Sequence, residues 1–175
     1  MEPVDCFDEG ATMTDLSALM ECMMRFFQKQ KWIEHSAKVF AYAVGIGDGE
    51  RLSRDEMTIL GASALLHDIG IPSAKERYGD SAGEHQEAES ARLAPELMRK
   101  AGVPERYWER VAWLVGHHHT EHLAGDDQLL QMLMEADYLV NLVEGNVKDR
   151  SPREVYDGFF RTATGKRYLA ALFKF

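Results

Sequence analysis

Apolar side chains recur every three or four residues along most of this chain, which is the spacing of one face of an α-helix. In the first such segment the repeat runs through Leu16, Met20, Met23 and Phe27. The same pattern predicts helices over residues 13–29, 32–44, 53–68, 84–100, 104–115 and 128–143, a helix that opens at 151, and a last one over 165–173. No segment shows a convincing strand pattern, so we expect an all-α fold of eight helices.

Two of these helices begin at a clear capping signal. Ser53 is followed three residues later by Glu56, and Ser151 in the same way by Glu154. In such capping boxes each side chain bonds to the backbone N–H of the other residue. Pro152 also stands at the first helical position, where its missing N–H costs nothing. We therefore expect well-defined helix starts at both places.

Three segments carry glycine, proline or charge in place of an apolar repeat. The string GIGDGE at 45–50 is expected to break the second helix, 71–83 to form a loop and 120–127 to form a turn. The chain has 175 residues with no repeat and no low-complexity linker. We expect a single domain over 1–175, with its core at about 20–145 and the helices of 151–173 packed on it as part of a compact bundle.

Composition narrows the class of partner. The 29 acidic residues outnumber the 20 basic ones, giving a net charge of -9, which argues against nonspecific binding to nucleic acid. The negative net charge is compatible with a small phosphorylated ligand, because bound cations can make the local electrostatic potential positive. No stretch approaches the roughly 20 apolar residues of a membrane span, and the N-terminus lacks the pattern of a signal peptide. Cys6 and Cys22 make no disulfide framework. We expect a cytoplasmic protein without a membrane partner; its oligomeric state is not predicted.

Four residues with metal-ligand chemistry lie on three of the predicted helices. His35 lies inside the second helix, His67 and Asp68 end the third, and Asp137 lies in the apolar run of the sixth. Taken alone, His35 could be a core histidine and Asp137 a buried salt-bridge partner. Together, two imidazole nitrogens and two carboxylates suit a divalent transition metal such as iron, manganese, cobalt, nickel or zinc. A buried carboxylate also needs such a partner.

This ordered set resembles the HD-domain superfamily of metal-dependent phosphohydrolases. The family pattern is a histidine, a His-Asp pair and a distant aspartate on successive core helices, and the string LLHDIGIP is similar to the usual context of the pair. The resemblance covers about residues 20–145. It implies an all-α HD domain with His67 and Asp68 at the catalytic centre. The implied substrate is a phosphate ester or anhydride of a nucleotide or related small molecule.

The resemblance further implies two metal ions. Subgroups with two ions carry additional histidines between the pair and the last aspartate, and His85 with His117 or His118 matches those positions. In that arrangement Asp68 bridges the ions. His35, His67 and Asp137 hold the first ion, and a hydroxide between the metals attacks phosphorus.

The chain also departs from the pattern of HD-GYP proteins and from the usual HD context. The Gly-Tyr-Pro element of HD-GYP proteins is absent, which weakens a prediction of cyclic di-GMP hydrolysis. The lysine common soon after His-Asp-x-Gly is replaced by Ile71. Lys38, Lys75 and Arg77 are candidate phosphate-binding residues, with solvated surface charge as the simpler interpretation.

The same residues are compatible with other functions. His118 to His122 matches the H-x-x-E-H string of some zinc proteases, but it falls where a helix ends. We interpret His119 and His122 as exposed loop residues. Two alternatives to a phosphohydrolase are a noncatalytic HD-type signalling or interaction module and a di-iron oxygenase of the same superfamily.

Overall fold

The computed structural model describes residues 13–175, and their side chains from residue 16 onward. Its elements are α1 (Met13–Phe26), α2 (Gln30–Gly49), α3 (Arg54–Leu66), α4 (Ile71–Tyr78), α5 (Gly83–Lys100), the 3-10 turn η1 (Glu105–Tyr107), α6 (Trp108–Val115), α7 (Glu121–Ala124), α8 (Gln128–Glu144), α9 (Pro152–Gly158) and α10 (Ala163–Phe173). The described part of the chain contains no strand. The prediction of an all-α fold is confirmed.

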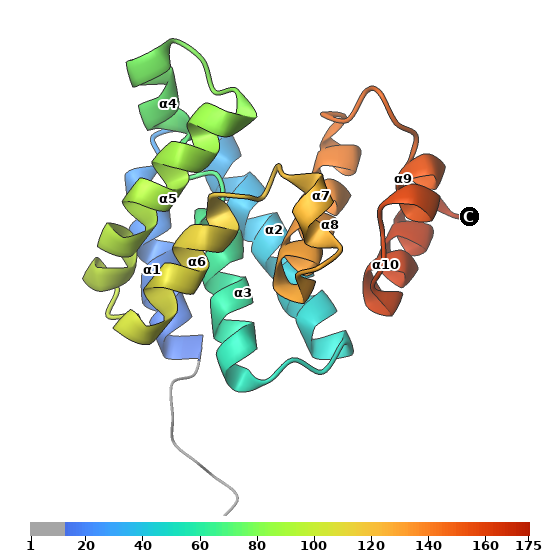
Figure 1. The fold of residues 1–175 in the computed structure, drawn as a ribbon, viewed down its shortest axis with the longest axis horizontal. Coiled ribbons are helices and arrows are strands. Elements are labelled where there is room, and N and C mark those ends of the chain that lie inside the picture. Colours follow the sequence, from blue (N-terminus) through green and yellow to red (C-terminus); the bar gives the residue numbers. More distant parts are fainter. Residues whose placement is uncertain (1–12) are drawn as a thin grey trace, which may run out of the picture.

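Helices α2 and α3 run next to each other through the middle of the bundle, as Figure 1 shows. Helices α1 and α6 pack on one side of α3, with α5 packed against both of them, whereas α8 packs against α2 and α3 on the other side. The C-terminal helices α9 and α10, orange to red in Figure 1, lie beyond α8. The C-terminal end of α3 therefore lies between the two halves of the bundle.

Two apolar clusters correspond to these halves. One includes Leu65 of α3 and Met98 of α5. The other includes Ile46 of α2, Leu133 of α8 and Leu169 of α10. Helix α3 contributes side chains to both clusters, so packing on two sides holds its end in place. Among the described helices, none is both long enough and apolar enough to cross a bilayer.

Both predicted capping boxes are present. The side chain of Ser53 accepts a hydrogen bond from the backbone N–H of Glu56, and Glu56 in turn accepts from the backbone N–H of Ser53. Ser151 and Glu154 make the same reciprocal pair at the start of α9. These local signals located the starts of α3 and α9 correctly because each depends only on residues within one turn.

The predicted break at 45–50 is wrong, because α2 continues to Gly49. Its glycines allow close packing: a methyl group on Gly45 would come within 2.7 Å of the Tyr168 hydroxyl oxygen, and one on Gly47 within 3.0 Å of Met57 Sδ. Glycine weakens a helix by only about 1 kcal/mol relative to alanine, so close packing against neighbouring elements outweighs it here.

Two further segments predicted as irregular are helical. Helix α4 occupies most of the predicted loop 71–83, and the short α7 lies in the predicted turn 120–127. Helix α4 starts with Pro72 in its first turn and ends at Gly79, whose φ of 82° is left-handed. Ala74 is its one buried residue, so the segment carries no apolar repeat from which a helix could be predicted.

Candidate metal centre

The His67-Asp68 pair lies at the corner where α3 ends. Helix α3 stops at Leu66, and the chain turns into α4 through Gly70. The backbone N–H of Gly70 donates to Ser90 Oγ of α5 at 2.9 Å, and that hydroxyl donates to the carbonyl oxygen of His67 at 2.7 Å. Helix α5 therefore fixes the backbone that carries the pair.

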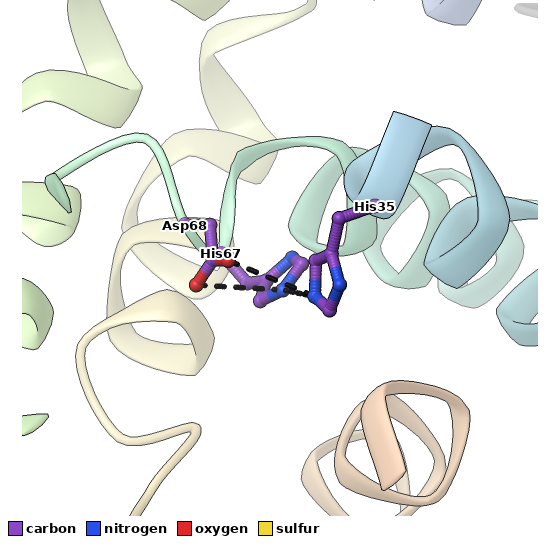
Figure 2. Close-up of side chains that lie close together, drawn as sticks. All are labelled: His35, His67 and Asp68. Atoms are coloured by element: carbon purple, nitrogen blue, oxygen red, sulfur yellow. Dashed lines mark hydrogen bonds and ion pairs between the residues drawn. The ribbon is translucent and has the colours of Figure 1, made fainter. Parts of the chain in front are cut away.

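Side chains from three elements converge at this corner. His35 points from α2 toward His67 and Asp68, as Figure 2 shows. The Nε2 atoms of His35 and His67 are 3.3 Å apart, and His35 Nε2 is 3.7 Å from Asp68 Oδ2. Asp137 of α8 places Oδ1 3.0 Å from His35 Nε2 and 3.5 Å from His67 Nε2. The structure thus brings together the four residues that sequence analysis assigned to the first ion.

Hydrogen bonds on the other ring nitrogens orient both imidazoles. Nδ1 of His67 lies 2.8 Å from the carbonyl oxygen of Ala64, so it carries the proton and Nε2 faces the cluster. Nδ1 of His35 lies 2.9 Å from Glu144 Oε2 at the end of α8. Carbonyl and carboxylate partners of this kind are typical of metal-bound histidines, because they fix the ring and raise its basicity.

The carboxylates at the centre are held in their ionised form. Burial raises the pKa of Asp68, but the charge of the adjacent His67 outweighs it and lowers the pKa to about 2. Burial has the same effect on Asp137, where hydrogen bonds from His35 and His67 prevail and keep its pKa far below the usual range. Two buried carboxylates of this kind need positive charge between them.

The pKa values of the two histidines are raised. Burial lowers the pKa of His35, but its hydrogen bond with Asp137 and the nearby carboxylates raise it to about 9. The pKa of His67 is also raised, because the charge of Asp68 outweighs burial. Both rings therefore compensate the carboxylates when protonated, a role that a cation can take over.

The donor set fits a divalent transition metal. Atoms bound to one ion at about 2.1 Å lie about 3–4 Å from one another, and the cited contacts of His35 and His67 with each other and with the two carboxylates fall in that range. Donor atoms of His35, His67 and Asp68 all lie within 4.8 Å of one another. Two imidazole nitrogens with two carboxylates are ligands suited to iron, manganese, cobalt, nickel or zinc.

A glutamine lies on the other side of Asp68. The Gln86 amide donates a short hydrogen bond to Asp68 Oδ1, and its Nε2 is 3.2 Å from His118 Nε2. His118 Nδ1 lies 2.7 Å from the carbonyl oxygen of Val115 and carries the proton, so Nε2 is the acceptor. Both amide hydrogens of Gln86 are thus used, and they link Asp68 to the buried His118.

The structure does not bring His85 or His117 to the cluster. His85 Nδ1 pairs with Asp80 Oδ1 at 2.7 Å, and its ring stacks on Tyr78 at 4.2 Å between centroids. His117 stacks on Trp113 and lies 2.7 Å from that residue's carbonyl oxygen. Of the adjacent pair 117 and 118, only His118 is within 4 Å of Asp68, at 3.8 Å.

His119 and His122 are both exposed, as predicted, and His119 lines the smaller cavity beside the cluster. The prediction that both lie in a loop is wrong for His122, which lies in α7. The candidate phosphate-binding residues Lys38 and Arg77 pair with carboxylates. Lys38 forms a salt bridge with Glu144 at 2.9 Å, and Arg77 one with Glu89 at 2.8 Å.

The cluster lies at the junction of two cavities. A cavity of about 380 Å³ includes Trp32, His35, Asp68 and Glu144 in its lining. One of about 260 Å³ on the other side is lined in part by His118 and Asp137. Two asparagines, Asn141 and Asn146, line both. A ligand can therefore approach the cluster from two directions.

Sequence analysis missed Gln86, Glu144 and Asn141. A signal for Gln86 existed: buried positions recur along α5 at Gln86, Ser90 and Ala94, a spacing that places Gln86 and not its neighbour on the inner face. Asn141 lies one turn after Asp137 and donates to its Oδ1 at 2.8 Å, which the i,i+4 spacing could have indicated. Glu144 gave no signal, because its role depends on how α8 packs against α2.

Comparison with known families agrees with this geometry. The HD domain family matches residues 32–142, more than half of the chain and a span that contains every residue of the cluster. No curated protein and no solved structure gives a significant match. The matched span includes the His-Asp corner, the histidine before it and the aspartate after it, and on this evidence the chain belongs to the HD domain family.

Proposed function

We propose that this protein is a metal-dependent phosphohydrolase acting on a phosphate ester or anhydride of a nucleotide-like small molecule. The observation that supports it best is the convergence of His35, His67, Asp68 and Asp137 beside two cavities. The membership of the HD domain family supports the same class of reaction.

The residues of the site would have distinct roles in the reaction. A divalent metal held by these four residues supplies Lewis-acid chemistry, activating water and offsetting charge on phosphoryl oxygens. Glu144 and the Ala64 carbonyl keep Nε2 of His35 and His67 directed at the site. His118 lines the smaller cavity, and its Nε2 accepts from the Gln86 amide that also donates to Asp68, so it helps to position that carboxylate.

We propose one ion as the resident metal of this arrangement. A second ion between Asp68 and His118 would require Gln86 to release both of them. It would also require His85 to leave Asp80 and Tyr78 if His85 were to bind through Nδ1. The dinuclear hypothesis thus needs rearrangement on α5, whereas a single ion needs none.

Metal content and hydrolysis, measured on the same preparations, test the proposal. Wild-type protein should contain about one transition-metal ion per chain and release phosphate from at least one member of a panel of nucleotides and simple phosphate esters. Asp68→Asn should lose at least about 100-fold in activity, because it removes a charged ligand. His122→Ala, an exposed residue beyond the cluster, serves as the control and should keep full activity.

Each alternative has its own outcome. Metal binding without hydrolysis of any panel member would contradict the proposal and favour the noncatalytic module. Iron as the bound metal, with oxygen consumption and no phosphate release, would favour the oxygenase. Activity that survives Asp68→Asn would show that the cluster is not the active site.

A further inference from the structure

Three lysines surround one tryptophan, Trp32, which lines the larger cavity. The ammonium groups of Lys29, Lys31 and Lys75 lie 4.9, 5.9 and 5.4 Å from the centre of the Trp32 ring. Lys29 and Lys31 flank the start of α2, whereas Lys75 comes from α4. Phe27 packs beside the indole at 5.8 Å between centroids and helps to hold it. The two helices therefore gather positive charge around a single aromatic ring.

These cations lack the carboxylate partner that many other basic side chains of the described structure have. Basic side chains elsewhere commonly pair with carboxylates, as in Arg77 with Glu89, Lys100 with Glu96 and Arg110 with Asp127. Within the described residues, none of the three lysines around Trp32 has a carboxylate oxygen within 4.0 Å. Unpaired like charges repel one another, and in a chain of net charge -9 carboxylates are plentiful. Such a group is suited to an external anion.

One lysine of this group lines the cavity of the metal centre together with Trp32. Lys31 and Trp32 line the same cavity as His35 and Asp68. Its volume of about 380 Å³ lies within the range of about 300–1,000 Å³ typical of small-molecule sites. A substrate with one phosphoryl group at the cluster can thus extend toward the lysines without leaving the cavity.

We infer that the lysines around Trp32 form a subsite for a second anionic phosphoryl group, so that the preferred substrate carries a diphosphate or longer phosphate chain. This inference rests on the proposed function for the position of the reacting phosphate. Lysine ammonium groups bind phosphate as mobile point charges, which suits a chain of variable length.

The carboxylates in this cavity are unequally compensated. Glu144 is neutralised by Lys38 and His35. Within the described residues, the Glu34 carboxylate accepts a hydrogen bond from the neutral amide of Gln30 and forms no salt bridge, so its charge opposes an incoming anion. Removing that charge should therefore strengthen binding at the subsite.

Binding can be measured without any catalysis. Titration calorimetry of metal-free wild-type protein with tripolyphosphate should give a stronger interaction than with orthophosphate. The double variant Lys31→Gln/Lys75→Gln should weaken tripolyphosphate binding at least about tenfold, and Glu34→Gln should strengthen it about two- to fivefold. Lys166→Gln is a matched control, because Lys166 also lies over an aromatic ring, Tyr156 at 5.2 Å, but in α10. Equal affinity in wild type and double variant would overturn the inference.

Kinetics separate failure of this inference from failure of the proposed function. The double variant should lose at least about tenfold in kcat/KM on a nucleoside triphosphate and much less on p-nitrophenyl phosphate, which has a single phosphoryl group. Asp68→Asn should lose activity on both but still bind tripolyphosphate. An inactive wild type that binds tripolyphosphate through the lysines would overturn the proposed function alone. An equal loss on both substrates in the double variant would overturn the subsite alone.

Discussion

Glu144, the last residue of α8, lies 2.9 Å from Nδ1 of His35 in α2, and its other oxygen binds Lys38 at 2.9 Å. This contact ties the orientation of a candidate ligand to the packing of two helices that are distant in sequence. Because the carboxylate fixes the ring and raises its basicity, Glu144→Ala should weaken metal binding by about 10–100-fold. Competition with a chromophoric chelator measures this affinity.

The control for Glu144 is a glutamate that pairs with lysine elsewhere. Glu96 binds Lys100 at 2.7 Å on α5, away from the cluster. Glu96→Ala should leave metal affinity unchanged. Equal affinity in Glu144→Ala and wild type would show that His35 needs no partner on Nδ1.

Metal binding should release protons over a defined pH range. Burial lowers the pKa of His35, but Asp137 prevails and raises it to about 9, so below that pH the metal-free ring carries a proton that a metal ion must displace. Affinity should therefore rise with pH up to about 9, by up to tenfold per unit for one proton. Calorimetry at pH 7.5 in buffers of different ionisation enthalpy counts the protons. A metal affinity that is independent of pH from 6.5 to 9 would contradict the raised pKa of His35.

The number of metal ions bound per chain shows whether His85 and His117 are metal ligands. His85 is engaged by Asp80 and Tyr78, and His117 by Trp113, so alanine at either position should leave metal content at about one ion per chain. Elemental analysis of both variants beside His67→Ala, which should lose the metal, makes the measurement. A wild-type content of two ions that falls to one in His85→Ala would favour the dinuclear hypothesis.

How far the sequence predicts this centre depends on the range of each interaction. His35, His67, Asp68 and Asp137 could be placed because each lies on or next to an apolar helix face, where a charged or imidazole group needs a partner. The capping boxes that start α3 and α9 were predictable for a similar reason, since every contact lies within one turn.

The errors arise where tertiary packing decides. The glycines near the end of α2 looked like a helix break but fit against α10 and the segment after α2. Helix α4 has one buried residue and so no repeat to detect. At the site, adjacent helix positions point about 100° apart, and on α5 that rotation separates His85 from the inner face that Gln86 occupies.

Gly70 should be the most sensitive glycine of the centre. A methyl group there would overlap the carbonyl oxygen of Gln86 and the amide nitrogen of Ser90, both backbone atoms of α5 that cannot rotate away. Gly70→Ala should therefore force the α3–α4 corner away from α5, at a cost of about 1–3 kcal/mol in the free energy of unfolding. The same shift should weaken the Ser90 hydrogen bond to the His67 carbonyl and lower metal affinity.

Gly158→Ala provides the comparison, because a methyl group at the end of α9 would meet no atom within 4 Å. Urea unfolding of both variants, with and without metal, gives the two free energies. The expected pattern is a loss of stability in Gly70→Ala that grows when metal is present, since binding stabilises only a folded site. If both variants unfold like the wild type, α5 does not position the His67-Asp68 corner by close packing at Gly70.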